Sequence, residues 1–212
     1  RSVSALLLNR ASDLDITMKA TIILSGKSGS GKDMTAQFMK EELEKHKQNV
    51  LVIHFADALK WILHDYFNWD GKKDDVGRTL LQRVGTDIVR ATHPGYWTGI
   101  VVGLIEAFEP YSDFDVAIIP DARFENEINI ALQRLKNCIS VRIERKNADG
   151  TAWINPTLTE DQRNHPSETS LDVFAFDYIV HNDEGLDLLR ESAKTIIARS
   201  EERCVGKECR SR

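Results

Sequence analysis

Cysteine is scarce in this sequence: the chain has 3 cysteines among its 212 residues. Cys138 lies in an apolar run, whereas Cys204 and Cys209 lie in a polar C-terminal stretch. This spacing fits neither a disulfide framework nor a set of zinc ligands. Because few cysteines and no disulfide framework are typical of a reducing compartment, we expect the protein to be cytoplasmic.

Long apolar runs and an excess of basic residues are also missing. No stretch approaches the roughly 18 consecutive apolar residues that a membrane-spanning helix needs, and Leu6–Leu8 is too short for a signal peptide. The formal net charge is −5 at pH 7. We therefore expect a soluble protein with no membrane partner and no nucleic-acid polymer as partner. Its oligomeric state is not written in any motif, and a homodimer stays open.

The length of the chain suits one domain with a sizeable core. Residues 1–17 precede Met18 and the first apolar strand, so we interpret them as a leader or tag. We expect residues 18–200 to form the single domain. Residues 201–212 lack apolar periodicity and are expected to be a flexible tail.

Short apolar, β-branched runs alternate with stretches of helical periodicity along this domain. The runs are Ile22–Leu24, Val50–Phe55, Val116–Ile119, Ile139–Ile143 and Tyr178–Val180. Nearly continuous apolar strands are typical of parallel strands buried on both faces. The pattern predicts an α/β fold of three layers (α/β/α) with a mostly parallel sheet of about five strands, and ligands bound beyond the strands' C-terminal ends.

Two helical stripes are interpreted as core because their apolar residues recur on one face. The first stripe comprises Trp97, Ile100, Val101, Leu104, Ile105 and Phe108, and the second comprises Phe124, Ile128, Ala131, Leu132 and Leu135.

The most informative segment is G-K-S-G-S-G-K-D at residues 26–33, between an apolar strand and a helix-like stretch. Glycines let the backbone aim successive N–H groups at phosphate oxygens, the following helix N-terminus favours an anion, and Lys32 adds a mobile positive charge. The segment predicts a loop of the P-loop NTPase type that binds ATP; the alternative is a glycine-rich turn without ligand. The expected nucleotide-binding residues are Gly26, Lys27, Ser28, Gly29, Ser30, Gly31, Lys32, Asp33 and Met34.

Asp121 and Arg123 follow the predicted strand that ends near residue 119. A carboxylate at this edge of the sheet is placed to hold a phosphate-bound metal, although Asp121 could instead cap the next helix. Arg123 could take two phosphate oxygens at once, and its alternative role is a surface ion pair with Glu125 or Glu127.

Further candidates lie on the helical stretches of residues 57–108. In the predicted helix Val76–Ala91, the polar positions Arg83, Thr86, Asp87 and Arg90 share one side. That side could bind an acceptor or form a solvated face with an Arg83–Asp87 pair. Asp57 and Lys60 follow the second strand and could contact an acceptor, although Asp57 could equally be a helix N-cap.

The apolar pattern stops over residues 145–166, which we interpret as a mobile lid. Disorder is the alternative, but the position after a strand and the arginines Arg145 and Arg163 favour a lid. His165 also lies there. The other histidines show neither metal-ligand spacing nor a paired nucleophile, and most are expected to be structural.

A set of motifs resembles the phage-type deoxynucleoside monophosphate kinases over most of residues 20–190. Asp33 is unusual for a P-loop in general, where Ser or Thr follows the lysine, but it agrees with this family; Pro120 and Ala122 depart modestly from it. The motifs also resemble, more weakly, the animal-type phosphomevalonate kinases. The residues that carry the likeness are 25–33, 55–60, 77–82, 85–87, Trp97, 120–127, Ser167-Glu168, Leu171-Asp172 and Asn182.

The resemblance implies transfer of the ATP γ-phosphoryl group to a (deoxy)nucleoside monophosphate. It implies that Lys32 contacts the β- and γ-phosphates, that Asp33 and Asp121 hold Mg²⁺, and that Arg123 with Arg145 or Arg163 acts in catalysis. The expected acceptor-binding residues are Asp57, Lys60, Thr86, Asp87, Arg90, Trp97, Arg123 and Glu168, with a core role for Trp97 as the alternative. Phosphomevalonate as acceptor, and a nucleotide-binding switch protein without catalysis, remain the rival functions.

Overall fold

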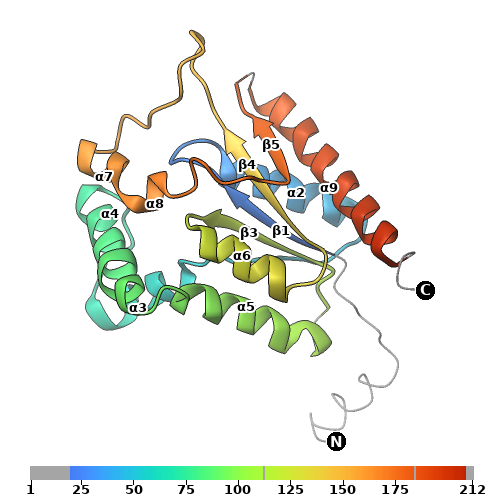
Figure 1. Cartoon of the computed structure of the whole chain (residues 1–212), viewed down its shortest axis with the longest axis horizontal. Helices are drawn as coiled ribbons and strands as arrows, with labels where there is room; N and C mark the ends of the chain where they lie inside the picture. The colour runs from blue at the N-terminus through green and yellow to red at the C-terminus, as the bar shows by residue number, and fades with distance from the viewer. Residues whose placement is uncertain (1–19, 112, 184, 209–212) are drawn as a thin grey trace, which may run out of the picture.

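The computed structural model describes residues 20–111, 113–183 and 185–208, with side chains described up to residue 200. The predicted leader of residues 1–17 lies outside these ranges. Five parallel strands form one sheet in the order β2-β3-β1-β4-β5, which confirms the predicted fold class (Figure 1). The strands are β1 (Ala20–Ser25), β2 (Val50–Val52), β3 (Val116–Ala122), β4 (Cys138–Glu144) and β5 (Tyr178–His181).

Strand β1 is central, and all six of its residues are buried. It pairs with β3 on one side and with β4 on the other. Strand β2 is shorter than the predicted Val50–Phe55 run: it ends at Val52, and Ile53 N makes one more bond to β3, to Ile118 O at 3.1 Å. The N–H groups of Phe55 and Ala56 bond to the carboxylate of Asp121 rather than to a neighbouring strand.

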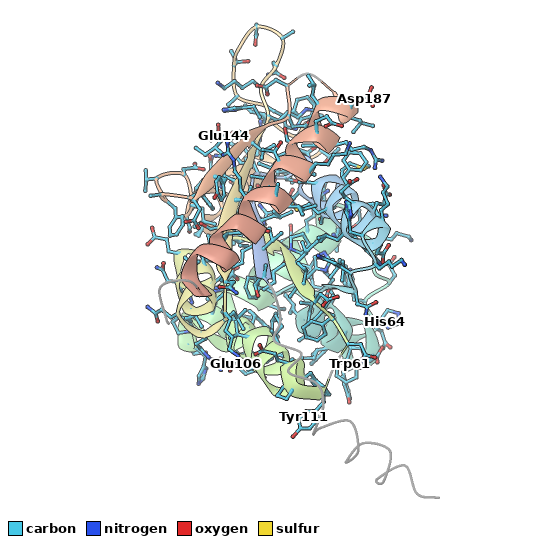
Figure 2. All side chains as sticks on the ribbon, turned by 90° about the vertical axis from the view of Figure 1, so that its right-hand side faces the viewer. Trp61, His64, Glu106, Tyr111, Glu144 and Asp187 are labelled. Carbon is cyan, nitrogen blue, oxygen red and sulfur yellow. The ribbon has the colours of Figure 1, made fainter. Side chains whose placement is uncertain are left out.

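Helices cover both faces of the sheet (Figure 1). On one face, α2 (Lys32–Lys45) and α9 (Leu186–Glu208) bury Met39 and Leu189 against Ile22 and neighbouring strand residues. Figure 2 shows α9 lying across this face with α2 beside it. On the other face, α5 (Tyr96–Phe108) and α6 (Glu125–Arg134) bury Val102 and Ile128 against the sheet.

The predicted stripe on α5 is core only in part. Trp97, Val101 and Ile105 are buried, but Leu104 is 44% exposed and Phe108 is 55% exposed. Leu104 and Phe108 therefore point partly to solvent. A 3₁₀ turn, η2 (Glu109–Tyr111), follows it.

A smaller apolar cluster joins α5 to α3 (Asp57–Phe67) and α4 (Asp75–Gln82), around Leu59, Leu63 and Trp97. The predicted helix Val76–Ala91 forms, but its second half is a π-helix, η1 (Arg83–Arg90). The indole N–H of Trp97 donates to the carbonyl of Gly85 at 3.0 Å, and a Cβ at Gly85 would lie 2.6 Å from Leu59 Cδ2. π-helical turns are frequent at functional sites, so η1 is a candidate part of such a site.

The predicted lid is mostly irregular but is not free of structure. Lys146 and Ala152 form an isolated antiparallel bridge, and two short helices follow, α7 (Glu160–Asn164) and α8 (Pro166–Thr169). Gln162 donates to Asp75 O and Thr79 Oγ1, both at 3.2 Å, so α7 lies against α4 (Figure 1). The segment thus contains regular structure, and its role as a lid stays a prediction.

Helix α9 continues to Glu208, beyond the predicted start of the tail at residue 201, and residues 209–212 lie outside the described part. No helix within the described ranges has the length and apolar character required to cross a membrane.

The packing of α2 gives a stability test. Met39 is fully buried between α2 and the sheet, so Met39→Ala should lower the free energy of unfolding by about 2–5 kcal/mol through lost burial and a cavity. Gln37→Ala, at an exposed position of the same helix, should change it by only about 0.5 kcal/mol. Equal effects in urea unfolding would contradict the assigned core.

Candidate functional site

The 26–33 loop joins β1 to α2 at the C-terminal edge of the sheet. Gly29 and Gly31 have φ values of 79° and 106°, in the left-handed region that favours glycine. A Cβ at Gly26 would lie 2.4 Å from the carbonyl oxygen of Ile143. The glycines are thus required by both backbone conformation and close approach, as expected for a loop whose main-chain groups do the binding.

Lys32 begins α2 and is only 7% exposed. Its amine donates to the carbonyl of Lys27 at 2.9 Å. Burial, assisted by the nearby Arg123 guanidinium, lowers the pKa of Lys32 to about 7, while Glu168, Asp33 and Asp121 act in the opposite direction. A buried amine with so low a pKa would be stabilised in its charged form by an incoming anion.

A cavity of about 500 Å³ opens between the loop and the cluster of α3, α4, η1 and α5. Much of the predicted site lines this cavity. Its lining includes the predicted residues Ser28, Gly29, Lys32, Asp33, Lys60, Thr86, Arg90, Trp97, Asp121, Arg123 and Glu168. Residues that were not among the predicted site residues line the cavity as well, including His54, Lys73, Arg78, Phe124 and Glu127.

Arg123 lies at the junction of the loop and the cavity. Its Nη1 is 2.8 Å from Glu168 Oε1 and donates to Gly26 O at 3.3 Å. The alternative of a surface ion pair with Glu125 or Glu127 was wrong, since it is the backbone N–H of Arg123 that donates to the Glu127 carboxylate. The guanidinium instead contacts Gly26 of the 26–33 loop and Glu168.

Asp121 and Asp33 are the two predicted metal ligands, and both act to raise the pKa of Lys32. Asp121 accepts from Phe55 N at 2.8 Å and Ala56 N at 3.1 Å, so it ties β3 to the start of α3. The N-cap alternative for Asp121 was wrong, because Phe124 occupies the N-cap position of α6. Asp33 is exposed in the first turn of α2.

These carboxylates fit Mg²⁺ in donor chemistry, since Mg²⁺ prefers oxygen ligands and usually keeps water and phosphate oxygens. Among the described residues, no group of three or more His, Cys, Asp or Glu side chains could hold a metal ion on its own. Metal binding by Asp33 and Asp121 therefore stays a prediction that requires bound phosphate.

Arg90 is already paired by the protein. Its Nη2 pairs with the carboxylate of Glu127, its Nη1 donates to Pro94 O at 3.0 Å, and its guanidinium lies 4.1 Å from the Phe124 ring centroid. Glu127 is 2% exposed, and burial raises its pKa. Arg90 and Phe124 thus form a nearly neutral wall of the cavity rather than a free positive charge.

Asp57 and Lys60 form a pair at the cavity edge. Asp57 accepts from Lys60 Nζ at 2.9 Å and from His54 N at 2.8 Å. Although partial burial opposes the effect, the hydrogen bonds from His54 and Lys60 lower the pKa of Asp57. Asp57 is the first helical residue of α3, and the N-cap is Ala56, so the N-cap alternative was wrong.

Asp87 does not line the 500 Å³ cavity. Its Oδ1 lies 3.2 Å from His165 Nε2, which connects η1 to the segment after α7. Since Ser167 N donates to His165 Nδ1, the ring proton belongs on Nε2 and points at Asp87. Asp87 thus makes this longer-range contact instead of the Arg83–Asp87 pair that was the alternative to acceptor binding.

The lid residues contact the 26–33 loop at two points. Arg145 donates to Gly29 O at 3.3 Å and lies over the ring of Trp153 at 4.1 Å, and Asn155 Nδ2 donates to Ser28 Oγ at 2.9 Å. Arg163 instead lines a second cavity, of about 550 Å³, which shares Ser28, Asn155, Leu158 and Glu168 with the first. Trp153 and Asn155 were missed because no recognised motif contains them.

No family model matches this sequence, and none of the curated proteins does. Solved structures are similar in fold. A gluconokinase from Sinorhizobium meliloti 1021 superposes with a TM-score of 0.54 at 16% identity, covering 90% of this chain and 98% of that one. An APS kinase from Mycobacterium tuberculosis gives a TM-score of 0.43 at 14% identity, covering 86% and 96%. At this identity the likeness shows that this chain shares the fold of the gluconokinase.

The low pKa of Lys32 predicts that anion binding takes up a proton above pH 7. Free Lys32 loses its proton near pH 7, and a bound phosphate chain would restore the charge, so affinity should fall as the pH rises from 7 towards the pKa of the bound state. Calorimetric titration of ADP without metal, near pH 8 in buffers of different ionisation enthalpy, measures the uptake. At this pH the phosphates of ADP are fully ionised.

The matched control is Lys32→Met, which should abolish the uptake. A wild-type protein that binds ADP near pH 8 without taking up a proton would contradict the assigned environment of Lys32.

Proposed function

We propose that this chain transfers the γ-phosphoryl group of ATP to the phosphate group of a (deoxy)nucleoside monophosphate. One observation carries the proposal: the 26–33 loop and the helical wall of α3, α4, η1 and α5 enclose the same cavity of about 500 Å³. Such a cavity has room for the phosphates of a donor on one side and a small acceptor on the other. The similarity to a chain named as a gluconokinase agrees with phosphoryl transfer in general.

The donor side is the 26–33 loop. Successive amide groups at the start of α2 would bind the phosphate oxygens, and the helix N-terminus adds a favourable dipole. Lys32 opens this helix, where its charge can neutralise the β- and γ-phosphates. Asp33 and Asp121 would hold Mg²⁺, directly or through water, and the metal would supply further charge neutralisation.

The acceptor side combines apolar and cationic groups. Leu59, Trp97 and Phe124 offer apolar surface for a base. The other predicted contacts are Asp57, Lys60, Thr86, Asp87, Arg90 and Glu168, of which Asp57 and Asp87 lie outside the cavity lining. Arg123 stands between the two sides and would hold the acceptor phosphate against the γ-phosphoryl group. Lys73 and Arg78 add positive charge on the same wall.

This reaction needs no general base, because a phosphate monoester acceptor has a second pKa of about 6 and is largely ionised at neutral pH. Catalysis then depends on alignment, charge neutralisation and exclusion of water. Arg145 already contacts the loop through Gly29 O, and Arg163 would have to move towards it from the other cavity.

A coupled assay of ADP release with a panel of deoxynucleoside monophosphates and phosphomevalonate tests the proposal. We expect stimulation by at least one nucleotide, and we expect Lys32→Ala to lower turnover by about 100-fold or more while the protein stays folded. Stimulation by phosphomevalonate alone would establish the rival kinase. Tight ATP binding without stimulation by any acceptor would establish a switch protein, and wild-type turnover by Lys32→Ala would exclude the role of Lys32.

The metal assignment has its own test. Asp33→Asn should raise the Mg²⁺ concentration needed for half-maximal turnover by about tenfold, since it removes one charged oxygen ligand. Asp161→Asn, on the surface helix α7, removes the same charge elsewhere and should leave the titration unchanged. An unaltered Mg²⁺ titration in Asp33→Asn would assign Asp33 to stabilising the N-terminus of α2.

A further inference from the structure

The carboxylate of Glu168 occupies the place where the proposed function puts a phosphoryl group. Its Oε2 accepts from the backbone N–H of Ser28 at 2.9 Å, and its Oε1 lies 2.8 Å from Arg123 Nη1. One amide of the 26–33 loop and the arginine that faces it are thus bridged by a single internal anion. The Glu168 side chain is 9% exposed, so this contact is shielded from water.

Glu168 also lies where two cavities meet. It lines both the 500 Å³ cavity, towards α3, α4 and α5, and the 550 Å³ cavity, whose lining includes Trp153 and Arg163. Ser28, Asn155 and Leu158 line both cavities as well. A phosphate bound at the Ser28 amide would therefore lie next to the Glu168 carboxylate.

We call residues 165–172 the strap, because both of its ends are fastened. At the first end His165 Nε2 meets Asp87 Oδ1 at 3.2 Å on η1. At the other end the Asp172 carboxylate lies 2.8 Å from Lys27 Nζ and 3.1 Å from Arg142 Nη2. Glu168 is therefore held over the loop from both sides, and its contact with Ser28 is not a chance orientation of a free surface side chain.

An ionised carboxylate and a phosphoryl group cannot both hold Arg123 and the Ser28 amide. The two groups carry like charges, and repulsion between them in a shielded site costs several times more than it would in water. Binding of phosphate at this point requires Glu168 to leave, and the free energy of its two contacts is subtracted from the free energy of binding.

From this geometry we infer that Glu168 is a built-in competitor for the phosphoryl groups of the substrate. The inference rests on the proposed function, which supplies the phosphoryl groups. While no substrate phosphate is present, Glu168 neutralises Arg123 and occupies the hydrogen-bond donor of the Ser28 amide. When a phosphate arrives, Glu168 is displaced and Arg123 is released to bind it.

The opposite assignment is a structural ion pair that holds Arg123 in its productive position. The two assignments predict different changes in phosphate affinity when Glu168 is replaced. A competitor lowers phosphate affinity, so its removal raises the affinity; a structural partner organises the site, so its removal lowers the affinity or leaves it unchanged.

The test is calorimetric titration of pyrophosphate, and of ATP without metal, into the wild type, Glu168→Gln and Glu160→Gln. We expect Glu168→Gln to lower both dissociation constants by about tenfold or more, because it removes the competing charge while keeping the side-chain shape. Glu160 is an exposed carboxylate that lines the 550 Å³ cavity, so Glu160→Gln removes the same unit charge nearby and should bind within about twofold of the wild type.

Thermal melting checks that each variant is folded, and Glu168→Ala carries the same expectation should the glutamine variant not fold. An unchanged or raised dissociation constant in a folded Glu168 variant overturns the inference. The wild-type assay with nucleotide acceptors separates the two proposals: turnover by the wild type without tighter binding in the variants removes only this inference. Tighter binding without turnover in the wild type removes only the kinase proposal.

Discussion

The concentration of positive charge around the 26–33 loop is the constraint on which the rest of the site depends. Lys32 is buried at the start of α2, and Arg123 reaches the same place from the end of β3. Burial and the nearby Arg123 guanidinium both lower the pKa of Lys32. Such an arrangement is stable only with a bound anion or with carboxylates supplied by the protein.

The chain supplies those carboxylates from distant segments. Glu168 neutralises Arg123, Glu127 neutralises Arg90, and Asp172 bridges Lys27 and Arg142. The Glu168 and Asp172 pairs join the strap to Arg123 and to the 26–33 loop, and the Glu127 pair joins α6 to η1. Protein carboxylates therefore balance these cations when no phosphate is bound. The pairs differ in exposure: Arg90–Glu127 is buried, whereas the Asp172 pair is partly open to water, and the buried pair contributes to the fixed wall of the cavity.

The fold could be predicted because its determinants are local. Strands β1, β3 and β4 are apolar runs buried on both faces, and the glycines of the 26–33 loop mark their own positions by the conformations that only glycine adopts readily. The π-helix η1 could not be predicted, because its register depends on the contact of Trp97 with Gly85 and on the close approach of Leu59. The end of β2 likewise depends on Asp121, 65 residues away from Ala56.

The sequence predicted where residues of the candidate site lie better than it predicted which side chains they contact. Asp121 and Arg123 lie at the sheet edge where strand ends place them, yet the alternative ion pairs, of Arg123 with Glu125 or Glu127 and of Asp87 with Arg83, were wrong. Short spacings favour neighbours along one helix, whereas Glu168 is 45 residues from Arg123 and His165 is 78 residues from Asp87. Glu127 was considered only as a surface partner, and its burial becomes visible only when α6 is packed on the sheet.

The central claim is that the 26–33 loop holds the phosphates of a nucleotide. A crystal structure with a non-hydrolysable ATP analogue tests it most directly. We expect the phosphate oxygens to accept hydrogen bonds from the amides of residues 28–33. We also expect Lys32 to turn from the Lys27 carbonyl towards these oxygens, and Glu168 to be displaced from Ser28. A nucleotide bound elsewhere, with Glu168 still joined to Ser28 and Arg123, would contradict it.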